Sequence, residues 1–349
     1  MPIADIISFA ITIKLVFLRF KMCILMDQLS LIRKPIENEL KEYKVLFDSC
    51  FTHEDEYLNT ALQYVGSRQG KMMRPILVLL VAREFGPVRE ATLRSAVALE
   101  LLHTSSLIHD DVVDESGKRR GHASANAIYG NKVAVLVGDY ILAATLHQAA
   151  LTKDVRIVDI IALLGGTLSE GEVRQLANIR SEVSTEEAYF HIIQRKTAAL
   201  FTACARLGAL SAGAPESLAE EISKFAEIVG VCFQIRDDIF DYYEDSNIGK
   251  PTGNDMAEGK LTLPAIYAVN HTERQDVRDW AAKVKAGTAT REEISNLVEY
   301  TKQAGGIDYA RDTMERMRTE ALGILDNFQN VEVREALLRY LDFTIGRDL

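Results

Sequence analysis

Residues 101–121 read LLHTSSLIHDDVVDESGKRRG, an apolar helix end followed at once by acidic and then basic residues. The pattern predicts one helix over residues 90–116 that ends near Gly117. Aspartates four positions apart project from one helix face, with β-carbons about 5–6 Å apart. These carboxylates repel each other near the negative end of the helix dipole, so stability alone does not explain them. A divalent cation such as Mg²⁺ does, because it prefers carboxylate oxygens and leaves positions open for phosphates. The acidic residues are Asp110, Asp111 and Asp114.

A second acidic stretch repeats this pattern. Residues 234–241 read QIRDDIFD, and the first aspartates of the two stretches lie 127 positions apart. One such cluster on a helix end is most often a solvated surface. Two copies flanked by Leu, Ile, Val and Phe are poorly explained by solvation, so we expect them to face each other across one cavity. The second set is Asp237, Asp238 and Asp241.

The bulk composition describes a helical globular protein. The 349 residues are 48% apolar and 26% charged, with only 7 Pro and 21 Gly, which favours long helices over a turn-rich sheet protein. A net charge of −10 argues against broad binding of nucleic acid or anionic lipid. The cysteines show no metal-ligand spacing, which predicts inert thiols in a reducing cytoplasm. They are Cys23, Cys50, Cys204 and Cys232.

Residues 1–25 differ from the rest of the chain. This stretch is mostly apolar, but its charge-free run over residues 6–13 is much shorter than a membrane-spanning helix needs. A membrane-grazing segment, a targeting sequence and an over-extended start all stay open. Met26 opens an ordinary amphipathic stretch, so we expect residues 1–25 to be a dispensable extension and residues 26–349 to form the functional domain. The predicted helices there are 29–48, 72–85, 90–116, 123–129, 132–151, 154–178, 185–212, 217–243 and shorter ones over 261–349.

Basic residues accompany the acidic clusters. The stretch GKMMRP (70–75) places two cations at a helix start, where backbone N–H groups also favour an anion. Each cation alone is most often an ordinary surface residue. Together they supply what two diphosphates require, which is metal on one and Arg and Lys on the other. The candidates are Lys71, Arg74, Arg119, Arg120, Lys196, Lys250 and Lys260.

These motifs, in this order, resemble the trans-isoprenyl diphosphate synthases of the long-chain polyprenyl branch, from about Leu29 to the C-terminus. The resemblance implies an all-α, single-domain antiparallel helix bundle around a deep central cavity, usually as a homodimer. The motifs are GKMMRP (70–75), LLHTSSLIHDDVVDESGKRRG (101–121), GDY (138–140), EGEVRQL (170–176), QRKTAAL (194–200), FQIRDDIFDY (233–242) and GKPTGNDMAEGKLTLP (249–264).

The resemblance also implies a role for each matching residue. Asp110 and Asp114 bind Mg²⁺ on an allylic diphosphate, supported by Asp111. Asp237, backed by Asp238 and Asp241, holds a further Mg²⁺, giving three ions per site. The departing pyrophosphate leaves an allylic carbocation that the isopentenyl double bond attacks. The isopentenyl diphosphate ligands are Lys71, Arg74, His103 and Arg120. The allylic side is completed by Arg119, Lys196, Thr197, Gln234, Lys250 and Lys260, and Glu172 and Gln175 line the cavity.

Product length depends on the residues that precede the first acidic cluster. Ser105 and Ser106, followed deeper by Leu101 and Leu102, leave the tunnel floor open where short-product relatives often carry aromatic residues. We therefore expect a product of about C30–C50, by family analogy, as for a quinone side chain that partitions into a membrane. Bulky residues such as Leu142 or Leu146 could set the floor instead.

Four alternatives stay open. A short-chain farnesyl or geranylgeranyl synthase differs only in how the tunnel is closed. A terpene cyclase lacks isopentenyl-binding cations and carries a different second metal motif. A non-catalytic subunit of a heteromeric synthase is expected to lose the aspartates or the basic motifs, none of which is missing. A phosphohydrolase built on His103 and His109 needs more histidines near the metal and leaves the second acidic cluster unexplained.

Overall fold

A computed structural model describes residues 28–68, 70–119, 121–179, 185–243 and 252–346, and nearly all of them are helical. This confirms the predicted all-α class. Residues 28–33 are helical, and they lead into η1 (Lys34–Ile36). The helices that follow are α2 (Glu37–Ser49), α3 (Glu56–Gly66), α4 (Met73–Phe85), α5 (Glu90–Val113), α6 (Ala125–Tyr129), α7 (Asn131–Leu151), α8 (Val155–Ile179), α9 (Glu186–Ile193), the π-helical η2 (Gln194–Ala198), α10 (Ala199–Ala212), α11 (Glu216–Phe240), α12 (Asn254–Ala257), α13 (Leu263–Asn270), α14 (Gln275–Lys285), α15 (Arg291–Gln303), α16 (Gly306–Leu325) and α17 (Val331–Ile345).

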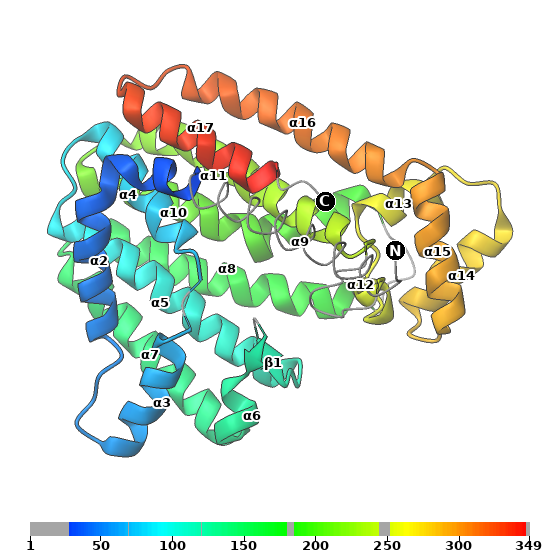
Figure 1. Ribbon diagram of the computed structural model, residues 1–349, viewed down its shortest axis with the longest axis horizontal. Coiled ribbons are helices and arrows are strands. Elements are labelled where there is room, and N and C mark those ends of the chain that lie inside the picture. The colour runs from blue at the N-terminus through cyan, green and yellow to red at the C-terminus, as the bar shows by residue number, and fades with distance from the viewer. Residues whose placement is uncertain (1–27, 69, 120, 180–184, 244–251, 347–349) are drawn as a thin grey trace, which may run out of the picture.

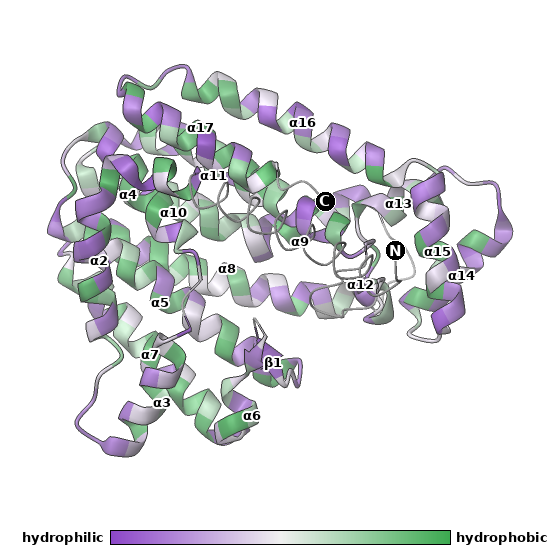
Figure 2. Ribbon diagram, in the orientation of Figure 1, coloured by the Kyte–Doolittle hydropathy of each residue, from purple (hydrophilic) through white to green (hydrophobic). Residues whose placement is uncertain are grey.

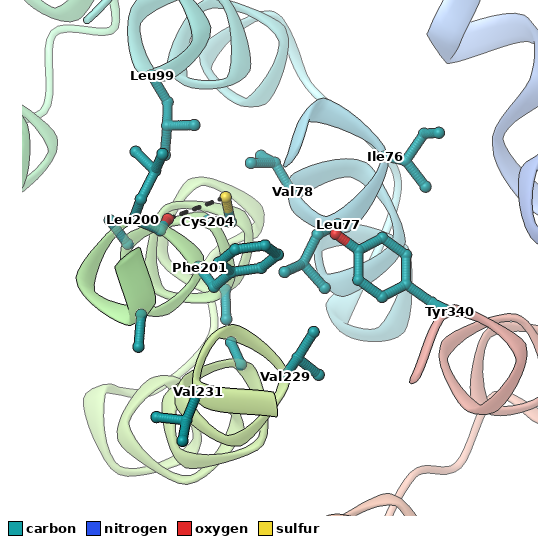
Figure 3. Close-up of a cluster of buried hydrophobic side chains, with 14 of the residues drawn as sticks. Ile76, Leu77, Val78, Leu99, Leu200, Phe201, Cys204, Val229, Val231 and Tyr340 are labelled. Atoms are coloured by element: carbon teal, nitrogen blue, oxygen red, sulfur yellow. Dashed lines mark hydrogen bonds between the residues drawn. The ribbon is translucent and has the colours of Figure 1, made fainter. Parts of the chain in front are cut away.

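The core of the bundle lies between α4, α5, α10 and α11. Every residue of α4 from Pro75 to Ala82 is buried, as expected of a helix that is apolar on all sides. Gly208 allows α10 to pack directly on α4, because a β-carbon there would lie 2.5 Å from the carbonyl oxygen of Val78. Figure 3 shows the side chains that fill this contact, including Phe201 from α10 and Tyr340 from α17.

The remaining helices surround this core. Figure 1 shows α16 and α17 along one edge, α3 and α6 at the opposite edge, and α14 and α15 at one end. Along α14, α15 and α16, hydrophilic and hydrophobic residues alternate, as expected of helices with one face in water (Figure 2). Among the described residues, α7 is the one helix long and apolar enough to cross a membrane, and 39% of its most apolar window is buried. Length and composition of this kind are equally typical of a core helix in a soluble protein.

The predicted helix 185–212 is borne out, since α9, η2 and α10 continue from one to the next without a break from Glu186 to Ala212. The structure corrects three other details of the predicted elements. A two-stranded hairpin, β1 (Lys118–Arg119) and β2 (His122–Ala123), follows α5, which ends at Val113 rather than at residue 116. The short helix α3 was not predicted, and it begins where the side chain of Asp55 accepts a hydrogen bond from the backbone N–H of Leu58.

Candidate active site

The first acidic cluster lies at the end of α5, where the β1–β2 hairpin folds back on it. The buried carboxylate of Asp111 accepts hydrogen bonds from Arg119, with Nε and Nη2 each 2.7 Å from Oδ1. Asn126 Nδ2 donates to the Asp111 backbone carbonyl at 3.1 Å. These contacts occupy Asp111 and fix the helix end. Asp110 is half-buried, and Asp114, which caps the helix, is exposed.

Asp110 faces residues of α8 and η2. Burial raises the pKa of Asp110, and the negative charge of Glu172 raises it further, while Lys196 opposes both. Lys196 Nζ lies 2.6 Å from Glu172 Oε2 and donates to Gln175 Oε1 at 2.9 Å. Glu172 and Gln175, which were predicted to line the cavity, therefore hold the lysine near the first acidic cluster.

Two glycines bring the π-helical segment η2 to this place. A β-carbon on Gly171 of α8 would lie 3.1 Å from the backbone nitrogen of Lys196. A β-carbon on Gly230 of α11 would lie 2.6 Å from the α-carbon of Ala198. The segment η2 therefore packs closely on both helices, and the contact with α11 requires that position 230 lack a side chain. π-Helical turns occur frequently at functional sites, and this one carries Lys196 and Thr197.

The second acidic cluster is more deeply embedded than the first. Asp238 is buried, and it accepts hydrogen bonds from Tyr189 Oη at 2.5 Å and from Gln234 Nε2 at 2.8 Å. Burial raises the pKa of Asp238 to about 8, and the nearby charge of Asp255 adds to the effect. Gln234 Oε1 in turn accepts from Thr197 Oγ1 at 2.7 Å. Predicted residues from η2 and α11 thus form one hydrogen-bonded chain.

Asp241 fixes the segment that follows the second cluster. Its carboxylate accepts from the backbone N–H of Asn254 and of Asp255, at 3.1 and 3.0 Å, at the start of α12. Burial raises the pKa of Asp255 to about 6, with Asp241 as the next cause. Lys260 follows on the same segment. Although burial favours its neutral form, the pKa of Lys260 is raised, because Glu258, Asp255 and Asp114 outweigh burial.

Asp237 is the most open member of the second cluster. Its side chain is 44% exposed, and its Oδ1 accepts from Arg236 Nη2 at 2.9 Å. The surrounding protein still removes enough water to raise the pKa of Asp237, and Arg236 opposes that shift. Arg236 is itself buried between the rings of Phe233 and Phe240, and it also donates to the carbonyl oxygen of Thr344 in α17.

Two lysines link the first cluster to Asp255, whose backbone N–H binds Asp241 of the second cluster. Lys196 influences both Asp110 and Asp255, and Lys260 influences both Asp114 and Asp255. One cavity of about 180 Å³ adjoins the second cluster, and its lining includes Lys196, Thr197, Gln234, Asp238, Asp255 and Lys260. Another, of about 460 Å³, adjoins the first cluster, and its lining includes His103, Asp111, Arg119 and Arg68.

One of the predicted isopentenyl-binding residues, His103, lines the cavity of about 460 Å³. Gly70 also lines it, and Lys71 and Arg74 follow Gly70 at the start of α4. Arg74 is half-buried, with its Cζ 5.6 Å from the ring centre of Phe201, and its Nε finds no hydrogen-bond partner within the described ranges. Two predicted residues, Arg120 and Lys250, lie outside the described residues.

The residues predicted to set product length, 101–102 and 105–106, lie near the middle of α5. Ser105 is buried and donates to the carbonyl oxygen of Gly138 in α7 at 2.9 Å, whereas Ser106 donates to the carbonyl oxygen of His103 within its own helix. Leu101 and Leu102 are buried beneath them. The alternatives are half-buried Leu142 and Leu146, which is 50% exposed. Their effect on the product stays a prediction.

The donor set at the first cluster is suited to Mg²⁺. Asp110 and Asp114 offer carboxylate oxygens. The pKa of Asp110 is raised by burial and then by the negative charge of Glu172, and a bound cation would offset both effects. Over the described ranges, no three His, Cys, Asp or Glu side chains are gathered closely enough to hold a metal ion. At the second cluster, Asp238 and Asp241 are engaged by protein donors, which leaves Asp237 as the more available carboxylate.

The sequence motifs indicate no function for Tyr189, Arg236 or Asp255. Asp255 belongs to the quoted stretch 249–264, and its position between Lys250 and Lys260 is a sequence signal that could have identified it as a site residue. Arg236 lies within the quoted stretch 233–242, but its contact with α17 is not visible in the sequence. Tyr189 carried no local signal, because its contact with Asp238 joins residues 49 positions apart.

Comparisons with known proteins agree on one family. The sequence model described as polyprenyl synthetase matches residues 55–301. The octaprenyl diphosphate synthase of Haemophilus influenzae is 33% identical over 286 residues, which cover 82% of this chain and 87% of the relative.

Solved structures agree with the fold over nearly the whole chain. A structure described as geranylgeranyl pyrophosphate synthase from Bacteroides thetaiotaomicron is 47% identical, with a TM-score of 0.81, covering 92% of this chain and 100% of its own. A decaprenyl diphosphate synthase from Rhodobacter capsulatus is 31% identical, with a TM-score of 0.84, covering 90% and 98% respectively.

Proposed function

Because the chain belongs to the polyprenyl synthetase family, and is therefore a prenyltransferase, we propose that it condenses an allylic diphosphate with isopentenyl diphosphate to make a long-chain all-trans polyprenyl diphosphate. The observation that carries this proposal is that Lys196 and Lys260 each interact electrostatically with an aspartate of the first cluster and with Asp255, whose backbone N–H binds Asp241 of the second cluster. Such an arrangement can hold a metal-bound diphosphate from two sides while cations neutralise the charge that develops on departure.

The allylic diphosphate is placed between these clusters. Asp110 and Asp114 on one side and Asp237 on the other would hold Mg²⁺, which we assign as three ions, and these would supply Lewis-acid stabilisation of the leaving pyrophosphate. Lys196, Lys260 and Arg119 add positive charge to the same region and orient the diphosphate. Thr197 and Gln234, which are joined by a hydrogen bond, complete the lining on the allylic side. Asp111 and Asp238 support their neighbours, because protein donors already occupy both carboxylates.

Isopentenyl diphosphate is assigned to the start of α4. Lys71 and Arg74 project from a helix N-terminus, where backbone N–H groups and the helix dipole favour a phosphate. His103 and Arg120 complete the set. The isopentenyl double bond then attacks the allylic carbocation, and the released pyrophosphate takes up the proton that is lost. This chemistry needs no Ser or Cys nucleophile.

A long product is favoured by the small side chains of Ser105 and Ser106. The octaprenyl and decaprenyl synthases above support this assignment by name. The 47% identical structure described as a geranylgeranyl pyrophosphate synthase favours a second candidate, a C20 product. Replacing Ser105 with Phe separates the two candidates, because a long-chain enzyme then releases shorter products, whereas a C20 enzyme changes little.

We also propose a cytoplasmic homodimer. α7 and α8 carry large apolar side chains on their outer surface, among them Leu136, Leu146 and Leu163, which are 66%, 50% and 62% exposed. A second copy of the chain would bury this surface. The apolar product is expected to partition into a membrane after release.

The decisive experiment uses the purified protein alone. It is incubated with labelled isopentenyl diphosphate, farnesyl diphosphate and Mg²⁺, and the products are sized by reversed-phase chromatography. We expect products longer than C20 and no turnover in excess chelator. Activity without a partner also excludes a non-catalytic subunit, and turnover that persists in chelator would overturn the metal assignment.

A further inference from the structure

The backbone turns unusually just before α4. Met72 adopts a left-handed conformation with a φ of 55°, although it has a side chain. Residues other than glycine avoid this region, because the β-carbon approaches the following carbonyl oxygen. Strained residues persist only where the surrounding structure holds them, and they cluster at functional sites. Met72 lies between Lys71 and Arg74, two of the residues assigned to isopentenyl diphosphate.

Side chains from distant parts of the chain hold the carbonyl groups on both sides of Met72. Arg33, the last residue of the first described helical stretch, donates from Nη2 to the carbonyl oxygen of Lys71 at 2.9 Å. Tyr340, in α17, donates from Oη to the carbonyl oxygen of Met73 at 3.0 Å. The two donors lie 307 positions apart in the sequence, yet they bind the carbonyl groups of the residues immediately before and after the strained residue.

Tyr340 is well suited to this task. Its ring is fully buried in the core and reaches from α17 towards Leu77 of α4, as Figure 3 shows. Burial raises its pKa well above the usual value, so the hydroxyl keeps the proton that it donates. One turn later on α17, the ring of Phe343 lies 5.2 Å from Lys71 Nζ. α17 therefore contacts residues 71–73 in two places, at the backbone carbonyl of Met73 and at the side chain of Lys71.

We propose that Tyr340 and Arg33 are positioning residues for isopentenyl transfer, which hold Met72 in its left-handed conformation so that Lys71 and Arg74 stand ready for the diphosphate. This inference rests on the proposed function. Neither residue needs to touch substrate, because each acts through a carbonyl group of the segment that does.

The test replaces Tyr340 with Phe, which removes one hydroxyl and keeps the buried ring. Losing a hydrogen bond to a buried acceptor predicts about a five- to tenfold rise in KM for isopentenyl diphosphate, with an unchanged KM for the allylic substrate. Tyr300→Phe is the matched control, since Tyr300 Oη donates to Thr272 Oγ1 at 2.7 Å, in the contact between α15 and the end of α13. We expect Y300F to leave both KM values unchanged, although its melting temperature falls comparably.

A double-mutant cycle with Met72→Gly isolates the backbone effect. Glycine adopts positive φ without steric cost, so the segment no longer depends on its anchors. We expect Y340F to raise KM for isopentenyl diphosphate less than about twofold in the M72G background. The inference is overturned if Y340F behaves as Y300F does, or if its effect is equally large with and without M72G. A wild-type protein that transfers no isopentenyl group overturns the proposed function itself, which distinguishes the two failures.

Discussion

The two acidic clusters share one sequence pattern but differ in what surrounds them. At the end of α5, Arg119 of the hairpin binds Asp111, while Asp110 and Asp114 interact electrostatically with Lys196 and Lys260, respectively. At the end of α11, Asp238 is buried beneath Tyr189, and Asp241 holds the start of α12. The first cluster therefore offers most of its carboxylates to a ligand. In the second cluster, most of the carboxylates are already hydrogen-bonded to other groups of the protein.

The largest expected effect is the loss of Asp110. We expect Asp110→Asn to lower kcat/KM about a thousandfold, which corresponds to roughly 4 kcal/mol, because it removes a metal ligand. Its melting temperature should not fall, since a carboxylate with a raised pKa beside Glu172 does not stabilise the fold. Asp241→Asn should instead lower both activity and melting temperature. Equal losses of stability in the two variants would show that the clusters do not differ as described.

Lys196 tests whether the two clusters act together. Its ammonium group influences Asp110 on one side and Asp255 on the other. Lys196→Met should lower kcat about a hundredfold, because a positioned charge next to the leaving group is lost. Lys196→Arg should recover part of the activity. Steady-state kinetics at saturating Mg²⁺ measure both, and a K196M enzyme with unchanged kcat would remove Lys196 from the mechanism.

The sequence predicts the fold class and the pairing of the clusters because both depend on local patterns. Helical periodicity and the two DDxxD stretches are visible in short windows, and the structure bears out the class. What the sequence does not reveal depends on close approach between distant helices. The π-helical turn at Lys196 packs closely on Gly171 and Gly230, and nothing near residue 196 indicates that two glycines on other helices make room for it. The anchoring of Asp238 by Tyr189 is hidden for the same reason.

Gly230 provides the next test, because it lies on α11, the helix that ends at the second cluster, and packs against η2. A methyl group there would meet the α-carbon of Ala198 at 2.6 Å, so Gly230→Ala should destabilise the protein by roughly 2 kcal/mol and displace η2. Gly166→Ala is the matched control on α8, since nothing lies within 4 Å of its added methyl group. We expect G166A to be neutral or slightly stabilising. Urea denaturation gives both values, and equal stability of the two variants would contradict the close packing.

The smallest expected effect concerns the hydrogen bond from Tyr189 to Asp238. Because the folded pKa of Asp238, about 8, is above the unfolded value, its contribution to stability is present at low pH and is lost as the pH rises towards 8. The Tyr189 hydroxyl favours the ionised carboxylate, so Tyr189→Phe raises this pKa further. In metal-free buffer we expect Y189F to lose about 1 kcal/mol at pH 6 and more at pH 9, since hydrogen bonds to charged groups are stronger. Urea denaturation at both pH values measures the difference. A loss that is equal at both would mean that Asp238 does not ionise in the folded protein over this range, and the second cluster would then carry less negative charge than the first.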